Sequence, residues 1–323
     1  MNRPSVTLLV VALAVGSATS CATAKRPALQ PSAPVPGAVM WVAPTDIASR
    51  DLFYGPWGKA HAPDATDTFE LVESKHSGVN LGMTVKDSRN REWSVKTPYP
   101  GGLDSEAPVE VALSRILSAV GYPQPPIYHL PAFRLKDDFG TRTLEGGRFR
   151  LKDEQLEDQG EWRWEDNPFI GSKPYQGLLV MLMMFNSTDL KNSNNTLYLH
   201  RNGELVEQWY VVRDIGAALG DTVFLAPRKN NVEAFESSPF ITGVGDGGHV
   251  DFAYKGIYRK FVEDRIAVGD VEWASQQLAK LSDGQWQDAF RAGGYQPDGA
   301  RRFIAKLKEK IDAGRGLSRR AAR

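Results

Sequence analysis

The sequence predicts an α+β protein of two lobes, with an antiparallel sheet in the first lobe and mainly helices in the second. Short runs of alternating apolar and polar residues occupy the region from Phe69 to Lys96, a pattern typical of strands. Beyond Gly256 the apolar residues recur at helical spacing instead. Because 323 residues can bury a sizeable core, we expect two packed lobes, at residues 40–174 and 175–323.

The composition is that of an ordinary globular protein. Hydrophobic residues make up 41% of the chain and charged residues 24%. The 39 basic side chains balance the 39 acidic ones. No overall electrostatic field therefore draws the protein to nucleic acid or to an anionic membrane surface, and we expect no nucleic-acid partner.

Residues 1–20 predict a secretory signal peptide. Arg3 precedes an apolar run from Val6 to Val15, which is too short to span a bilayer stably, and small residues follow. The stretch from Ser17 to Cys21 resembles a bacterial lipobox, in which the cysteine is acylated, for example with palmitate, after cleavage. Ordinary cleavage nearby, or an inert cysteine, is the alternative.

Residues 21–39 predict an extended tether, because they hold four prolines and few large side chains. Cys21 is the only cysteine, so no disulfide can form within the chain. We therefore expect a lipid-anchored protein of the bacterial cell envelope, on its periplasmic or extracellular face.

The first lobe begins with a meander of strands at residues 69–74, 78–87 and 92–96, with a polar turn at 88–91 between the last two. A helix follows at residues 105–120, and Gly121 and Pro123 end it. Residues 127–174 mix short strand-like runs with polar loops and predict no definite arrangement.

The second lobe begins with a helix at residues 175–185 that is apolar all round, which indicates burial on every side. An asparagine-rich loop, a strand at 196–200, an Asn202-Gly203 hairpin turn and a strand at 208–213 come next. Apolar stripes then predict further helices, one of them through Ile257, Phe261 and Ile266.

Five polar residues occur in an order that suits a magnesium–nucleotide site. Lys96 ends a strand, Glu110 lies in the next helix, Asp189 and Asn194 are five apart in "DLKNSN", and Asp214 opens "DIG" after a strand. Such a site needs a lysine for phosphate oxygens, a carboxylate to hold that lysine, and oxygen ligands for a hard cation. On a helical wheel Glu110 borders the apolar stripe, where a carboxylate needs a partner such as Lys96.

This order resembles the protein-kinase fold. Lys96 matches the strand lysine of that family and Glu110 its helix partner. Asp189 and Asn194 match the aspartate and asparagine of the catalytic loop, with the same spacing. "DIG" at Asp214 is close to the metal-binding Asp-Phe-Gly motif.

The segment "VEVALSRILSAVGYPQPP" is more similar to the atypical HipA-like and CotH-like bacterial kinases, and the resemblance covers roughly residues 69–220. It implies ATP and Mg²⁺ as cofactors, with Lys96 on the phosphates and Glu110 holding Lys96. It further implies that Asp189 accepts the proton of an attacking hydroxyl and that Asn194 and Asp214 bind Mg²⁺.

Two features depart from the family pattern. Ser187 and Thr188 stand where most kinases have a histidine and an arginine before the aspartate. The only candidate for a glycine-rich loop over the phosphates is "SGVNLG", with Gly78 and Gly82. Both departures leave room for a pseudokinase.

Three functions remain open at this stage. The first is phosphoryl transfer from a nucleotide to a hydroxyl on an unknown protein or small molecule; the second is a non-catalytic, pseudokinase-type binding or envelope-structure protein. The third is a secreted domain unrelated to kinases, whose asparagines form turns or bind Ca²⁺. In that last case Lys96 and Glu110 would be solvated charges, and Asp214 would cap a turn.

Overall fold

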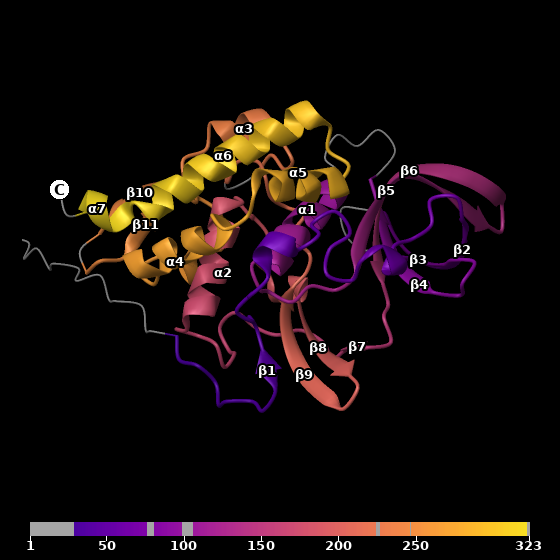
Figure 1. Ribbon diagram of the computed structural model, residues 1–323, viewed down its shortest axis with the longest axis horizontal. Coiled ribbons are helices and arrows are strands. Elements are labelled where there is room, and N and C mark those ends of the chain that lie inside the picture. Colours follow the sequence, from indigo (N-terminus) through magenta and orange to yellow (C-terminus); the bar gives the residue numbers. More distant parts are fainter. Residues whose placement is uncertain (1–28, 76–80, 99–105, 224–226, 246, 322–323) are drawn as a thin grey trace, which may run out of the picture.

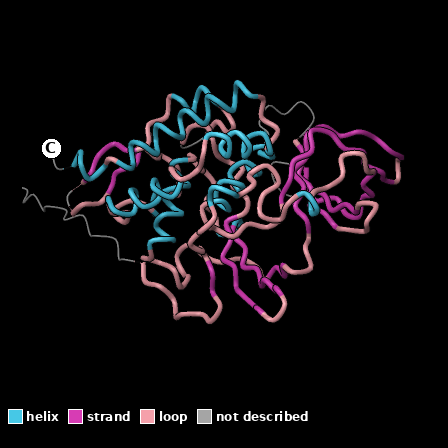
Figure 2. Tube along the Cα trace, in the orientation of Figure 1, coloured by secondary structure: helices cyan, strands magenta, loops and turns pink. Residues whose placement is uncertain are grey.

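The computed structural model describes residues 29–75, 81–98, 106–223, 227–245 and 247–321. A sheet-rich first part and a helical last part, as predicted, form a mixed α+β structure (Figure 1, Figure 2). The predicted signal peptide, Cys21 and Gly78 lie outside the described residues. Within the described chain, no helix combines the length and the apolar character needed to span a membrane.

Five strands close a small barrel in the first part, in the order β2-β3-β4-β6-β5 (Figure 1). They are β2 (Thr68–Lys75), β3 (Leu81–Lys86), β4 (Glu92–Thr97), β5 (Ile127–Asp137) and β6 (Gly140–Leu151). The predicted antiparallel meander of β2, β3 and β4 is confirmed. The sequence did not predict that β5 and β6 continue this sheet, nor that β2 and β5 pair in parallel to close it.

Aromatic side chains fill the barrel. Phe69, Trp93, Phe133 and Phe149 are all buried, and the rings of Phe133 and Phe149 meet edge to face with centroids 4.9 Å apart. Since side chains alternate across a strand, the neighbours of these residues on β4 and β6 point out of the barrel. That outer face carries the polar residues of the site described below.

The helix α1 (Glu106–Ala119) contacts the outside of the barrel at β5 and β6 and packs on its other side against α5. Arg50 fixes the end of α1, because its Nη1 donates to the carbonyl oxygens of Ser118 at 2.9 Å and Ala119 at 3.1 Å. Gly121 ends the helix with φ +106°. A Cβ there would lie 2.2 Å from the carbonyl oxygen of Val42, so the turn requires glycine.

A second sheet contains the predicted hairpin. Its order is β1-β9-β8-β7, with β1 (Ala38–Val39), β7 (Leu156–Asp158), β8 (Asn195–Asn202) and β9 (Leu205–Val212). The predicted hairpin is confirmed, but its turn residues are Gly203 and Glu204 and not Asn202 and Gly203, because Asn202 still pairs with Leu205; Gly203 has φ +62°. Strands from early and late parts of the chain thus share one sheet.

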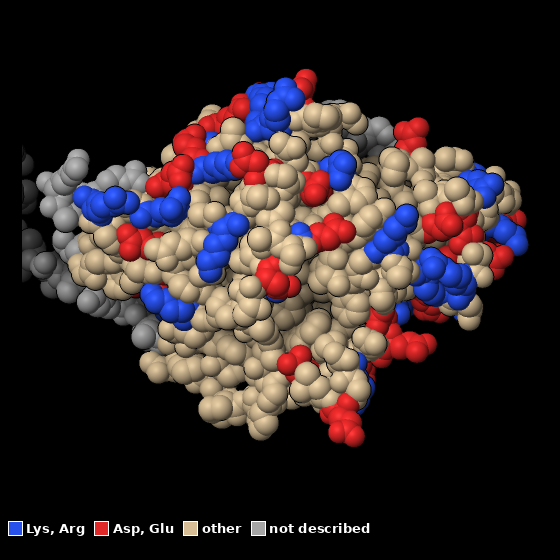
Figure 3. Space-filling view, in the orientation of Figure 1, with Lys and Arg blue, Asp and Glu red and all other residues tan. Residues whose placement is uncertain are grey.

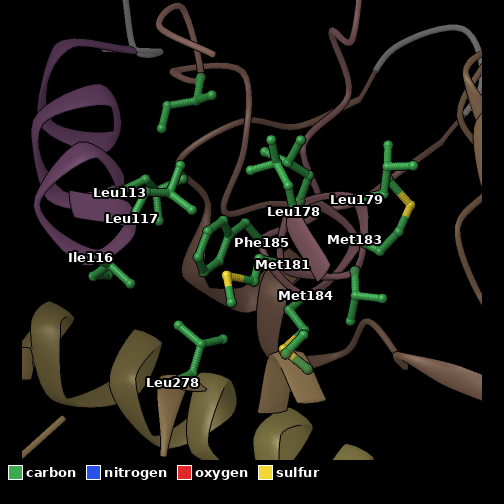
Figure 4. Close-up of a cluster of buried hydrophobic side chains, with 14 of the residues drawn as sticks. Leu113, Ile116, Leu117, Leu178, Leu179, Met181, Met183, Met184, Phe185 and Leu278 are labelled. Carbon is green, nitrogen blue, oxygen red and sulfur yellow. The ribbon is translucent and has the colours of Figure 1, made fainter. Parts of the chain in front are cut away.

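The helix α2 (Lys173–Met184) is buried on every side, as predicted. Its side chains meet those of α1 and α4, and Figure 4 shows Met181 and Phe185 among Leu113, Leu117 and Leu278. The remaining helices and strands are α3 (Val232–Glu236), α4 (Val268–Leu278), α5 (Asp283–Ala292), α6 (Pro297–Arg315), α7 (Leu317–Ala321), β10 (Ile241–Val244) and β11 (Val250–Phe252). The described residues also include four short 3₁₀ helices: η1 (Ile47–Ser49), η2 (Lys59–His61), η3 (Asn192–Asn194) and η4 (Arg259–Phe261).

The helix predicted through Ile257, Phe261 and Ile266 is wrong. Only η4 forms there, Ile257 is exposed, and α4 begins at Val268. Asp264 has φ +56°, which interrupts a right-handed helix. Phe261, in η4, and Ile266, in the loop before α4, are buried, because tertiary packing and not α-helical periodicity fixes their positions.

Replacing Phe149 by Ala should lower the free energy of unfolding by roughly 3–5 kcal/mol, because a fully buried ring would leave a cavity in the barrel. Urea denaturation measures this. The control is Phe139→Ala, whose ring is 95% exposed and whose loss should change stability by less than about 0.5 kcal/mol. Equal effects of the two substitutions would contradict the closed, aromatic-filled barrel.

Candidate functional site

A cleft of about 430 Å³ opens between the barrel and the two loops that follow α2 and β9. It brings together four of the five predicted site residues, and the fifth, Glu110, lies buried behind Lys96. Among the described residues, seven basic and three acidic side chains line it: Lys75, Lys96, Arg148, Arg150, Lys191, Arg213 and Lys229, and Glu106, Asp189 and Asp214. This excess of positive charge is local, because basic and acidic side chains are interspersed on the face shown in Figure 3.

Lys96 is held between two carboxylates. Its Nζ lies 3.1 Å from Asp214 Oδ1 and 3.6 Å from Glu110 Oε2. The side chain is still 27% exposed, so its ammonium group can be reached from the cleft. Glu110 is completely buried, and the alternative in which it is a solvated helix residue does not hold.

Two arginines that were not predicted from the sequence complete this ion cluster. Arg148 Nε lies 3.1 Å from Glu110 Oε1. Arg150 Nη2 bridges Glu110 Oε1 at 2.7 Å and Asp214 Oδ1 at 2.6 Å. The signal was present in "GGRFRL", since residues two apart on a strand share a face, but only the pairing of Lys96 with Arg148 shows which face it is.

The charges in the cluster shift one another's pKa values. Burial acts to raise the pKa of Glu110, but Arg148 and Lys96 outweigh it and the pKa falls below its usual value of 4.5. Burial likewise acts to raise the pKa of Asp214, and Arg150 and Lys96 hold it well below its usual range. Burial lowers the pKa of Arg148 to about 10. Both carboxylates are therefore ionised at neutral pH.

The position of Asp214 depends on the turn that follows it. Gly216 packs directly on the first turn of α1, where a Cβ would lie 2.6 Å from the Cβ of Glu106. The backbone N–H of Asp214 points to the carbonyl oxygen of Asn194 at 3.4 Å, which links the two loops. Glycine is thus required because α1 and the "DIG" turn approach so closely.

The loop at Asp189 is held by its own side chains and by the "DIG" segment. Asn194 Nδ2 donates to the carbonyl oxygen of Asp189 at 2.6 Å. Thr188 donates to the carbonyl oxygen of Ala217 from both its backbone N–H at 2.8 Å and its hydroxyl at 3.0 Å. Lys191 Nζ donates to Asp189 Oδ2 at 2.8 Å, and this hydrogen bond raises the pKa of Lys191. The Asp189 carboxylate remains about one-third exposed, at 34%.

A buried lysine anchors the start of this loop. Lys310, on α6, is 1% exposed, and its Nζ donates to Met184 O and Asn186 Oδ1, each at 3.0 Å. Asn186 in turn has φ +54° and donates to the carbonyl oxygen of Gly220 at 2.6 Å. In sequence Lys310 is one basic residue of an amphipathic helix, so nothing there indicates this role.

The other predicted residues have distinct positions. Gly82 pairs with Lys96 across β3 and β4 and lines the cleft. Asn192 Oδ1 accepts from the backbone N–H of Trp164, and Asn195 Nδ2 donates to the carbonyl oxygen of Trp162. These two asparagines therefore tie the loop to the segment at Trp162 and Trp164, and neither has the left-handed backbone of the turn-forming alternative.

A divalent metal does not fit Asp214 as it stands. One of its carboxylate oxygens is already shared by a guanidinium and an ammonium group. Within the described chain, no group of three or more His, Cys, Asp or Glu side chains could hold a metal. The Asn194–Asp214 pair thus remains a proposed metal site, and one that a guanidinium group opposes.

Comparison with known proteins gives only distant likenesses. No family model matches the sequence, and no curated protein matches it. The fold is similar to that of a Helicobacter pylori proinflammatory kinase, CtkA, with a TM-score of 0.46, 11% identity, and coverage of 78% of this chain and 98% of that one. A Golgi casein kinase with Mn/ADP bound has a TM-score of 0.40 and 8% identity, over 81% of this chain and 75% of that one. At this distance the geometry of the cleft is the basis for assigning a function.

Replacing Glu110 by Gln should lower the free energy of unfolding by about 3–5 kcal/mol at neutral pH, because it leaves buried cations without their counter-charge. The folded-state pKa of Glu110 is below 4.5. Its stabilisation is therefore complete above about pH 4.5 and is lost as the pH falls through the folded-state pKa. Urea denaturation of the wild type and of Glu110→Gln should show that the difference between their free energies of unfolding becomes smaller as the pH falls.

The matched control is Glu70→Gln, which removes an exposed ion pair with Lys136 and should change stability little. A Glu110→Gln protein as stable as the wild type at neutral pH would contradict the ion cluster.

Proposed function

We propose that this chain is a lipid-anchored envelope protein with a kinase-like fold. It binds a nucleotide in the cleft and transfers a phosphoryl group to a hydroxyl. One observation carries the proposal: Lys96, Glu110, Asp189, Asn194 and Asp214, far apart in sequence, lie in and directly behind one cleft.

The charge of the cleft suits a polyphosphate. Lys96 is 27% exposed, Lys191 51% and Lys229 22%, so three ammonium groups can be reached from solvent. Phosphate oxygens are strong acceptors for such donors, and binding in a partly buried cleft is screened less by salt than binding at an open surface. Arg148 and Arg150, buried behind these lysines, add to the positive potential of the cleft.

A second cavity of about 380 Å³ adjoins the cleft and shares four lining residues with it: Lys75, Ser94, Arg150 and Arg213. Leu156 and Tyr198 line part of this cavity, and charged residues that include Lys152, Asp153 and Asp158 line the rest. One aromatic ring together with polar groups suits a nucleobase, whose face is flat and whose edge forms hydrogen bonds. The nucleotide would therefore lie with its base in this cavity and its phosphates beside Lys96.

Asp189 supplies the group that accepts a proton. Its carboxylate reaches the cleft, and Lys191 holds it from one side. An acceptor hydroxyl oxygen would attack the terminal phosphorus of the nucleotide, its proton would pass to Asp189, and the bond from that phosphorus to the bridging oxygen would break. The Lys96 ammonium group would stabilise the negative charge that develops on the phosphate oxygens during transfer.

The proposed location rests on the first residues of the chain. The apolar run from Val6 to Val15, the lipobox-like stretch ending at Cys21 and the proline-rich tether support an anchor outside the cytoplasm. The acceptor would then be a protein or a small molecule of the envelope.

A second candidate is a protein that binds nucleotide without transferring its phosphoryl group. The ion pair between Arg150 and Asp214 favours this second candidate. In kinases a metal bound at the corresponding aspartate normally offsets the charge of the transferred phosphoryl group.

Replacing Asp189 by Asn should abolish phosphoryl transfer and leave nucleotide affinity unchanged, because the amide keeps the shape but cannot accept the proton. Release of nucleoside diphosphate in the presence of a pool of envelope components measures transfer, and calorimetry measures binding. Asp288→Asn, at an exposed ion pair, is the control. Binding without transfer by the wild type would favour the second candidate, whereas equal transfer by wild type and Asp189→Asn would remove Asp189 from the reaction.

Replacing Lys96 by Ala should weaken binding of ATP and of inorganic triphosphate alike, each by roughly tenfold or more, because both present phosphates to the same ammonium. Ligand-dependent thermal melting reports both affinities. Lys136→Ala, which removes an exposed lysine on β5, serves as the control. If neither ligand raises the melting temperature of the wild type, the nucleotide site does not exist.

A further inference from the structure

We infer that the cleft holds the phosphate chain of its ligand without a divalent metal, because Arg150 takes the place of the cation at Asp214. This inference rests on the proposed nucleotide binding. It goes beyond that proposal by naming the form of the ligand, the metal-free polyphosphate.

The first support is the geometry of Arg150. A single nitrogen, Nη2, lies 2.6 Å from Asp214 Oδ1 and 2.7 Å from Glu110 Oε1, so one guanidinium joins the two carboxylates. The Arg150 side chain is 9% exposed, and it sits on a strand of the closed barrel. A metal at Asp214 would have to compete with a group that packing holds in place.

The second support is the local charge. Two carboxylates, Glu110 and Asp214, face three cations, Lys96, Arg148 and Arg150, within the described chain. The cluster is therefore positive before any ligand binds. A dication would add to that charge, whereas a polyphosphate would offset it.

The third support is that unpaired donors outnumber unpaired acceptors in the cluster. Among the described residues, Arg148 Nη2 and Arg150 Nε are buried without a hydrogen-bond acceptor, whereas Glu110 Oε2 is buried without a hydrogen-bond donor. Arg148 is further fixed because its Nη1 donates to the carbonyl oxygen of Ser94 at 2.9 Å. A cluster with donors to spare favours an anion over a second cation.

The first test measures two kinds of binding to the wild-type protein: binding of Mn²⁺ alone, and binding of ATP or inorganic triphosphate. Mn²⁺ alone, followed by electron paramagnetic resonance, should show no bound fraction at millimolar protein and metal. ATP and inorganic triphosphate should bind with the same affinity in EDTA as in Mg²⁺, within about threefold. Their affinity should fall as salt is raised, but less steeply than for phosphates held at an open surface, because the cleft is partly buried.

Arg150→Gln provides the converse experiment. Freed from the guanidinium, Asp214 should gain measurable Mn²⁺ binding, and ATP affinity should become dependent on Mg²⁺ by roughly tenfold or more. Arg142→Gln is the matched control, because Arg142 lies on the same strand with an exposed side chain. It should behave as the wild type does.

The outcomes separate this inference from the proposed function. ATP binding by the wild type only when Mg²⁺ is present, or Mn²⁺ bound by the wild type, would overturn the inference and leave the nucleotide site standing. No binding of ATP or triphosphate under any condition would end both. If Arg150→Gln does not fold, the wild-type measurements with Mn²⁺ and EDTA still decide the question.

Discussion

The burial of the Glu110 carboxylate is the constraint on which the site depends. A charged carboxylate with no exposure is costly unless cations surround it. Lys96, Arg148 and Arg150 supply those cations from two paired strands, β4 and β6. One ion cluster thereby joins the helix α1, the barrel and the loop at Asp214. These three elements meet at the cleft.

The same cluster sets what the cleft can bind. Its cations outnumber its carboxylates, so its electrostatics favour an anion with several negative oxygens. The adjoining cavity adds the side chains of Leu156 and Tyr198 among charged residues. Phosphoryl transfer also needs a base and a means of offsetting charge. In the proposed reaction Asp189 would be the base, and fixed cations stand where a metal would otherwise offset the charge.

Much of the fold and part of the site could be predicted from sequence. The meander, the buried helix α2 and the hairpin of β8 and β9 follow from local periodicity and turn chemistry, although the turn lies one residue later than predicted. The order of Lys96, Glu110, Asp189, Asn194 and Asp214 indicated which residues to look for together. Arg148, Arg150 and Lys310 were missed, because each reads as an ordinary charged residue until a partner distant in sequence is placed beside it.

By itself the sequence determined the secondary structure of most segments and the chemistry available to the site, since both depend on residues close together in the chain. Only the tertiary structure decided how those residues combine. The register of β4 against β6 places Lys96 opposite Arg148 and aims Arg150 at Asp214. The physical reason is that a buried charge is tolerable only where its counter-charges meet it, and that meeting is fixed by strand pairing and helix packing rather than by spacing along the chain.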